Sequence, residues 1–140
     1  MPSASIVIAS EEEIRAGTLG RRLREFNYGI IGKYPEGQNV YLNAKDQQGN
    51  LLGGFRGEIY FDWLLVNILF VEESERRKGL GSRLLAEGEA RAKEKGALHS
   101  RLDTFEWQAP EFYLKHGYRG LANIPNYYQG YSLSIMMKEL

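Results

Sequence analysis

The sequence predicts a mixed α/β (α+β) domain, with a mostly antiparallel sheet of about six to seven strands flanked by helices. Residues 39–45 and 51–61 flank a run of turn-forming residues, which predicts an antiparallel hairpin. Trp63–Val71 is apolar at every position except Asn67, as is typical of a strand covered on both faces. Residues 79–96 repeat small and apolar side chains at a four-residue spacing, which predicts an amphipathic helix.

The N-terminal part adds one strand and one helix to this prediction. Residues 5–9 are rich in β-branched side chains and predict a first strand. Ser10 precedes three glutamates, a pattern typical of a helix cap followed by an acidic first turn. Because Gly17 and Gly20 interrupt the apolar spacing that follows, we expect this helix to be bent or broken. Glycines and a proline in residues 27–38 predict an irregular segment.

The C-terminal part predicts three more strands and a short helix. Residues 98–103 are expected to form a short strand, and residues 108–116 form a helical pattern that Gly117 closes. Two further strands are expected at residues 118–122 and 131–138. Strands and helices therefore alternate along the chain, as in an α/β class domain.

Composition limits the class of protein. A length of 140 residues with 43% apolar side chains suits one domain spanning residues 1–140. The 18 basic and 18 acidic side chains cancel, so we expect no nucleic-acid partner. The chain has no cysteine, which excludes disulfides, thiolate metal sites and a cysteine nucleophile. We expect neither a signal peptide nor a membrane span, and hence a cytoplasmic protein; whether two chains form a homodimer stays open.

A basic glycine loop precedes the strongest helix. Arg76, Arg77 and Lys78 lead into Gly79 and Gly81 at the predicted helix start. A helix N-terminus presents unpaired N–H groups and partial positive charge, and glycine lets an anion approach the backbone. The loop alone fits a phosphate cradle and a solvated helix cap equally well. It lacks the spacing of a nucleoside triphosphate loop and the third glycine of the dinucleotide fingerprint.

Two motifs in order resemble the GNAT acetyltransferase superfamily, especially a subgroup of small bacterial members. Residues 76–81 match its first signature, an Arg or Gln, two variable residues, Gly, one variable residue, and Gly or Ala. Residues 102–105, 108–113 and 117–118 resemble its second signature at the usual distance downstream. The resemblance covers the chain from about residue 53 and implies a GNAT fold, in which the strand equivalent to Trp63–Val71 splays from the next.

The resemblance implies acetyl-CoA as a co-substrate. Its pantetheine arm would pair with the backbone of Leu69, Phe70 and Val71 in the gap between the splayed strands. Gln108 stands near where many relatives use an asparagine toward this arm. The pyrophosphate would lie against the loop, on the family positions Arg76, Arg77, Lys78, Gly79, Gly81 and Ser82.

Tyr113 occupies the position of the tyrosine that many GNAT enzymes place beside the CoA sulfur. The departing thiolate needs a proton, and a nearby phenol can supply it. Tyr113 is therefore the predicted general acid, although an aromatic core residue beside Phe112 is the alternative, since the chain has nine tyrosines.

The base that deprotonates the amine is less clear. A lysine-like amine, with a pKa of about 10.4, must lose a proton before it attacks. Glu58, Asp62 and Asp103 are candidates, and Glu58 is the predicted base because the subgroup shares its Gly-Glu step; the alternative is an exposed strand carboxylate. Relatives often carry an acid where this chain has Asn67, and an amide cannot accept that proton.

The remaining candidates are weaker. His99 and His116 lack a neighbouring acidic or metal-ligand pattern, and no metal is implied. The tyrosine-rich residues 127–131 lie where relatives often form an acceptor pocket or a dimer edge, or else they are packing. The leading hypothesis is acetylation of a small-molecule primary amine by direct attack in a ternary complex. Acetylation of a protein N-terminus or lysine, and a catalytically silent acyl-CoA-binding module, remain open.

Overall fold

The computed structural model describes residues 3–140, and the chain divides into two compact units. Two consecutive helices make up most of the first unit. Helix α1 (Glu11–Ala16) begins at Ser10, whose side chain and backbone exchange hydrogen bonds with Glu13 in a capping box. Helix α2 (Thr18–Ile31) begins at Gly17, whose φ of 65° breaks the helix as the sequence predicted. This unit ends at Pro35, and the second spans Glu36–Leu140. The prediction of a single domain over residues 1–140 remains a prediction.

Two predictions for the first unit are wrong. Residues 5–9 form no strand; a strand needs a partner backbone, and the other described elements of this unit are helices. Residues 27–31 are not irregular but continue α2 to Ile31. One glycine inside a helix costs only about 1 kcal/mol, so Gly29 does not end α2. The helix ends at Gly32, where φ is 81°.

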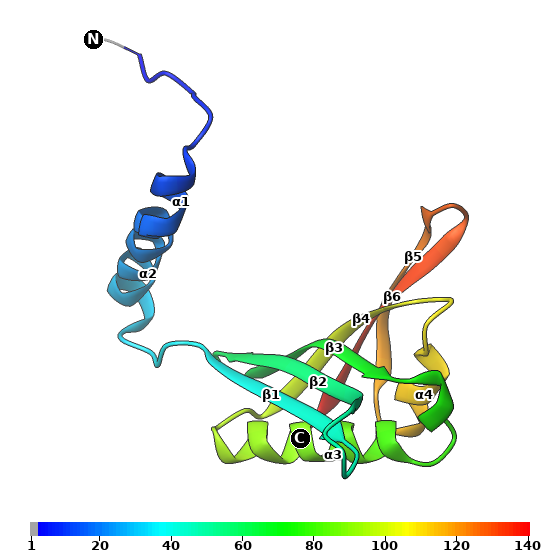
Figure 1. Ribbon diagram of the computed structural model, residues 1–140. Coiled ribbons are helices and arrows are strands. Elements are labelled where there is room, and N and C mark those ends of the chain that lie inside the picture. The colour runs from blue at the N-terminus through cyan, green and yellow to red at the C-terminus, as the bar shows by residue number, and fades with distance from the viewer. Residues whose placement is uncertain (1–2) are drawn as a thin grey trace. The chain divides into compact units, whose positions relative to one another are not determined.

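A six-stranded mixed sheet forms the second unit, in the order β1-β2-β3-β4-β6-β5 (Figure 1). All pairings are antiparallel except that of β3 with β4. The predicted hairpin, the buried strand and the C-terminal strands are all present, and the last hairpin is longer than predicted. The strands are β1 (Gln38–Lys45), β2 (Leu51–Tyr60), β3 (Trp63–Val71), β4 (His99–Phe105), β5 (Arg119–Tyr128) and β6 (Tyr131–Glu139).

The two central strands part halfway along their length. β3 and β4 pair in register only from Trp63 opposite His99 to Leu65 opposite Arg101. The register between β2 and β3 shifts just beyond Leu65, where β3 also leaves β4. Val66 and Ile68 pair with consecutive residues of β2, so Asn67 is the extra residue of a β-bulge. A bulge bends its strand, so β3 turns away from β4 beyond Asn67. The splayed strand pair that the resemblance implied is therefore present.

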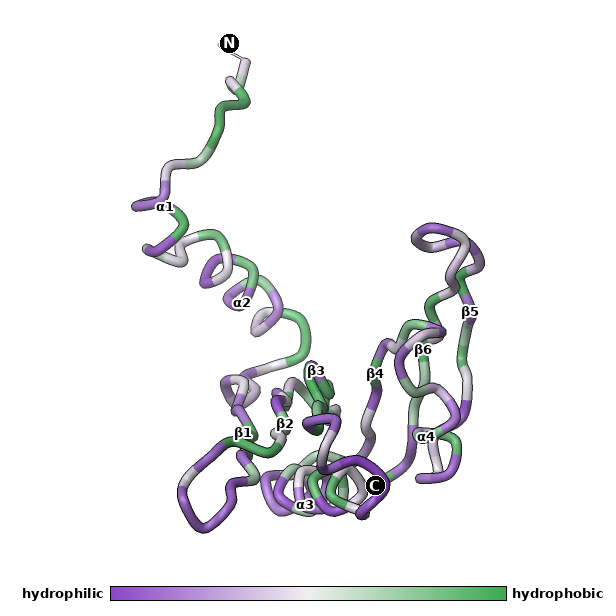
Figure 2. Tube along the Cα trace, turned by 45° about the vertical axis from the view of Figure 1, so that its right-hand side comes forward, coloured by the Kyte–Doolittle hydropathy of each residue, from purple (hydrophilic) through white to green (hydrophobic). Residues whose placement is uncertain are grey.

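The helices of this unit lie on the face of the sheet that holds the core. Helix α3 (Leu80–Glu94) runs along this face, and α4 (Pro110–Lys115) lies beside its first turn (Figures 1 and 2). The approach of α3 is close, because a Cβ added at Gly88 would lie 2.6 Å from the Phe55 ring. The core includes Phe55, Leu64, Leu85 and Leu102. Within residues 3–140, no helix is long and apolar enough to cross a membrane.

Candidate active site

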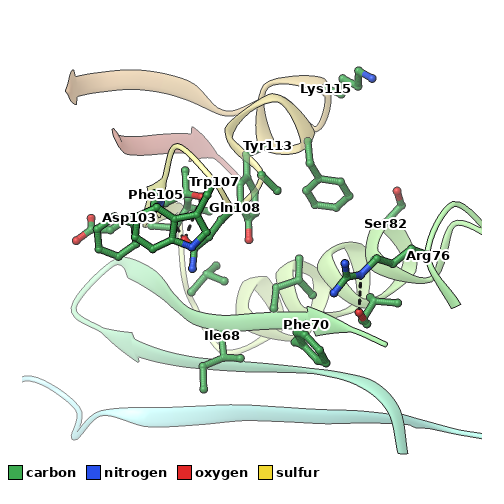
Figure 3. Close-up of a pocket in the computed structure, with 18 of the residues that line it drawn as sticks. Ile68, Phe70, Arg76, Ser82, Asp103, Phe105, Trp107, Gln108, Tyr113 and Lys115 are labelled. Carbon is green, nitrogen blue, oxygen red and sulfur yellow. Dashed lines mark hydrogen bonds between the residues drawn. The ribbon is translucent and has the colours of Figure 1, made fainter. Parts of the chain in front are cut away.

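A pocket of about 1180 Å³ occupies the gap between β3 and β4. At one end it is lined by the first turn of α3 and the loop before it, which we call the helix end. At the other end it is lined by Asp103, Phe105, Trp107 and Tyr127, which we call the aromatic end. Tyr113 lies between these ends, with its hydroxyl pointing into the pocket (Figure 3).

The helix end presents unpaired backbone donors. Gly79 is the N-cap of α3 and makes no side-chain cap bond, so the first N–H groups of the helix lack a capping oxygen. A Cβ on Gly79 would meet no atom within 4 Å, but the φ of 82° there disfavours any side chain. Gly81 lies close to Phe112, whose ring would be 3.5 Å from an added Cβ. This geometry suits a bound anion such as a phosphate group.

The three cations before Gly79 have different surroundings. Arg76 donates from Nε to the Val71 carbonyl at 2.9 Å, and its guanidinium lies 5.7 Å from the centre of the Phe70 ring. Lys78 pairs with Glu75 at 3.1 Å. Within residues 3–140, Arg77 has neither a hydrogen bond nor an ion pair. Arg76 therefore secures the end of β3, and Arg77 keeps its charge free for an anion.

Ser82, in the first turn of α3, is held by a histidine. The His116 Nδ1 atom lies 2.7 Å from the Phe112 carbonyl, which only accepts, so Nδ1 carries the proton. A ring whose one proton is on Nδ1 accepts the Ser82 hydroxyl at Nε2, and the Nε2 and Oγ atoms are 2.8 Å apart. His116 thus ties the helix that carries Tyr113 to the first turn of α3. The sequence suggested no such role for this histidine, because its partner lies 34 residues away.

The strand edge beside the pocket is unpaired. Beyond Leu65, β3 has no registered partner on the β4 side, although its other edge pairs with β2 as far as Val71. The backbone of Leu69 and Phe70 therefore lines the gap with peptide groups that β4 does not bind. An extended ligand with amide groups can add to such an edge as a further strand.

Tyr113 combines a buried ring with an accessible hydroxyl. Its ring makes edge contacts with Phe112 and Tyr118, and the whole residue is 8% exposed. Every buried side-chain polar atom that the structure describes has a hydrogen-bond partner. The Tyr113 hydroxyl has none and therefore reaches the pocket, as Figure 3 shows. Burial raises the pKa of this phenol above its ordinary value, so it keeps its proton at neutral pH.

Gln108 orders the loop between β4 and α4. Its side-chain oxygen accepts the backbone N–H of Phe105 at 2.9 Å and lies 3.5 Å from the Thr104 hydroxyl. The oxygen is therefore engaged, and the amide N–H₂ group is the part of this pocket residue left for a ligand.

The three carboxylates considered as bases lie in different places. Glu58 is exposed on β2, where it faces Leu65 and is not part of the pocket lining. Asp62 lies in the turn before β3, and its carbonyl accepts the Leu98 N–H at 2.7 Å. Asp103 lines the pocket, as does Asn67. The structure therefore separates Glu58 from Tyr113 and brings Asp103 into the same pocket.

An aromatic cluster lines the pocket beside Asp103. Phe105 and Trp107 stack at 4.3 Å with an interplanar angle of 8°, and the Tyr127 ring meets Phe105 edge-on at 5.4 Å. The sequence singled out residues 127–131 and placed Phe105 in the second motif, but it predicted no pocket role for Phe105 or Trp107. Within residues 3–140, no group of three or more histidine and acidic side chains is arranged to hold a metal.

Comparisons with known proteins agree with this geometry. Residues 36–120 match the family model described as an acetyltransferase (GNAT) domain. Blasticidin-S acetyltransferase of Streptomyces morookaense is 44% identical over 98 residues, which cover 69% of this chain and 72% of that protein.

Solved structures show the same fold. A crystal structure of an acetyltransferase from Bacillus cereus ATCC 14579 is 35% identical, with a TM-score of 0.87 over 98% of both chains. An acetyltransferase of Bacillus anthracis str. Ames, solved in complex with acetyl coenzyme A, has a TM-score of 0.66 at 18% identity. That match covers 81% of this chain and 68% of the other, and at such low identity it shows the fold alone.

Proposed function

Since the chain belongs to the GNAT acetyltransferase family, we propose that it transfers an acetyl group from acetyl-CoA to a primary amine of a small molecule. The observation that carries this proposal is the position of Tyr113. Its hydroxyl opens into the pocket between an uncapped helix N-terminus and an aromatic end that leaves room for a second substrate. One pocket thus provides for a phosphate-bearing donor, a proton donor and an acceptor.

The residues present fit acetyl-CoA. Its pyrophosphate would accept hydrogen bonds from the backbone of Gly79, Gly81 and Ser82, and the charge of Arg77 would balance it. The pantetheine amides would pair with the open edge of β3 at Leu69, Phe70 and Val71. Bound in this way, acetyl-CoA supplies an activated thioester carbonyl beside Tyr113.

We assign three supporting roles to side chains of the pocket. Arg76 fixes the end of β3 through its bond to Val71, and Lys78 adds positive charge near the phosphates while paired with Glu75. The amide N–H₂ group of Gln108 donates to the pantetheine arm, since its oxygen already holds the loop.

Tyr113 acts as the general acid in this proposal. The amine nitrogen attacks the thioester carbon, the carbon–sulfur bond breaks, and the sulfur leaves with the electron pair. The phenol of Tyr113 gives its proton to that sulfur, which avoids releasing a free thiolate in a partly buried site. The raised pKa of Tyr113 keeps this proton available at neutral pH.

The acceptor amine must lose a proton on its way to the pocket. Glu58, the base predicted from the sequence, lies on β2 outside the pocket lining, so any proton transfer to it runs through intervening water, and bulk water can take the proton in its place. Asn67 accepts no proton but can hold such a water through its amide.

A small molecule is the proposed acceptor because a relative 44% identical is named for acetylating blasticidin-S. Acetyl-CoA turnover with a panel of alkylamines, polyamines, amino acids, blasticidin-S and lysine peptides tests this proposal. We expect release of CoA to accelerate with at least one small amine and not with the peptides. Preference for peptides would make the chain a protein acetyltransferase, and tight CoA binding without turnover would make it a binding module.

A further inference from the structure

The two ends of the pocket carry charges of opposite sign. Among the charged residues that line it, Arg76, Arg77 and Lys115 lie toward α3 and α4, and Glu75 there is neutralised by Lys78. Asp103 is the one charged lining residue of the aromatic end. Figure 3 shows Asp103 and Arg76 at opposite ends of the pocket, with Tyr113 between them.

The side chain of Asp103 has no partner among the described residues. Its neighbours on β4, Leu102 and Thr104, are each 2% exposed and point into the core, so Asp103 faces the open side of the sheet. Within residues 3–140 its carboxylate makes neither a hydrogen bond nor an ion pair, even with Arg101 on the same face of the strand. A carboxylate left free at the wall of a pocket is available to a ligand.

Flat aromatic surface lies next to this carboxylate. Phe105 follows Asp103 by two residues on β4 and therefore lies on the same face of the strand. Trp107 stacks on Phe105 and meets Tyr131 edge-on at 5.1 Å. Trp107 and Tyr127 are 51% and 52% exposed and lie outside the buried core. Roughly half of each of these two side chains is therefore accessible to a ligand.

We propose that the aromatic end is a subsite for a flat cation, such as a guanidinium or amidinium group, carried by the acceptor beyond its reacting amine. This inference rests on the proposed transfer to an amine. The carboxylate of Asp103 accepts N–H groups from the edge of the cation, while its face lies on the aromatic rings. In Figure 3 the Asp103 carboxylate lies at the end of the pocket, with Phe105 and Trp107 drawn between it and Tyr113. The Asp103 carboxylate is therefore placed to bind the end of the acceptor that is farthest from its reacting amine.

The chemistry favours a flat cation over other groups. A guanidinium stacks on aromatic faces and donates two parallel hydrogen bonds to a carboxylate, so one group satisfies both features of the subsite. A neutral ring leaves Asp103 unpaired, and an anion is repelled by it. A compact ammonium pairs with Asp103 but uses the flat rings less well.

Steady-state kinetics with matched acceptors tests this subsite. Alkylguanidines that end in a primary amine, agmatine among them, are compared with alkylamines of the same length. We expect wild-type protein to prefer the guanidinium series by about tenfold in kcat/KM, the worth of one charge-assisted hydrogen bond at a partly exposed site. Asp103→Asn should abolish this preference, so that the ratio of kcat/KM between the two series falls to about one.

A matched control and a binding measurement complete the test. Glu94→Gln removes the same charge at the far end of α3, outside the pocket, and should leave both series unchanged. Trp107→Leu should weaken the guanidinium series alone. Calorimetric binding of agmatine to the CoA complex gives a readout independent of turnover, and Asp103→Asn should weaken it about tenfold.

Two outcomes overturn the subsite. One is equal use of both series by wild-type protein, and the other is an Asp103→Asn variant that loses both series alike, which would place Asp103 at the reacting amine. If no amine is turned over, the proposed function fails, and the calorimetry alone decides on the subsite.

Discussion

The helix end and the aromatic end of the pocket are built from different parts of the chain. At the helix end, the backbone of Gly79 to Ser82 and the open edge of β3 line the pocket, and Arg76 and Lys78 are bound to neighbours. At the aromatic end, the side chains of Asp103, Trp107 and Tyr127 line the pocket, and Trp107 and Tyr127 are each about half exposed.

This difference explains why the donor is easier to identify than the acceptor. Backbone N–H groups at a helix N-terminus recur wherever the fold recurs, so members of a family can share the acetyl donor that these groups bind. Side chains at a pocket mouth change without disturbing the fold, so they decide which acceptor one member takes. Substitutions that affect one end and spare the other test this division.

Tyr113→Phe, between the two ends, should have the largest effect. Loss of the phenol proton should lower kcat by about a hundredfold or more, while the KM values of both substrates stay close to wild type. Steady-state kinetics at saturating concentrations of both substrates measures this. Because burial raises the pKa of Tyr113, wild-type kcat should show no loss on the alkaline side up to about pH 10, where an ordinary tyrosine ionises. A Tyr113→Phe variant with wild-type kcat would falsify the general acid role.

Gly79→Val should affect the helix end alone. The φ of 82° strains a branched side chain, and the Cβ would enter the space where the phosphates are expected. We expect KM for acetyl-CoA to rise about tenfold or more, with KM for the amine unchanged. Gly96→Val is the matched control, since Gly96 has a φ of 101° after the other end of α3. If both substitutions raised KM for acetyl-CoA equally, the effect would come from backbone strain and not from the loss of a phosphate site.

The sequence predicted the helix end better than the aromatic end. Residues 76–81 are contiguous, so their motif, their glycines and the helix after them are visible in one stretch. The strand Trp63–Val71 was predicted with its observed bounds, because it is almost continuously apolar. Local patterns suffice where neighbours in sequence make the site.

Long-range pairing set the limits of the sequence prediction. Ser82 meets His116, and Glu89 meets both Tyr118 and Lys138, through contacts between distant residues. No pattern around any one of them indicates its partner. Residues 5–9 show the opposite error, since β-branched composition predicts a strand only where a partner backbone exists. The position of Glu58 outside the pocket lining also depends on sheet register, which the sequence left undetermined.

His116→Asn tests whether a side chain supports the backbone site at the helix end. Loss of the bond to Ser82 should raise KM for acetyl-CoA about fivefold, the worth of one ordinary hydrogen bond, because the first turn of α3 is held less firmly. KM for the amine should not change. The control is His99→Asn, which removes a histidine that pairs with Glu139 at the start of β4, away from the pocket lining. A larger change in KM for the amine than for acetyl-CoA would contradict this role for His116.

Glu58→Gln should have the smallest effect, and it decides how the amine loses its proton. Glu58 faces Leu65 on β3, which in turn faces Arg101 on β4, in the part of the sheet where the strands are still paired and no gap exists. A carboxylate in that position can take a proton from the pocket only through bridging water. Without the carboxylate, water can carry the same proton to the solvent. We therefore expect kcat and its pH profile to stay within about twofold of wild type. A loss of tenfold or more, with an acidic limb of the pH profile that disappears in Glu58→Gln, would instead establish Glu58 as the base. That result would mean that the open face of β2 belongs to the acceptor site, which would then extend beyond the aromatic end.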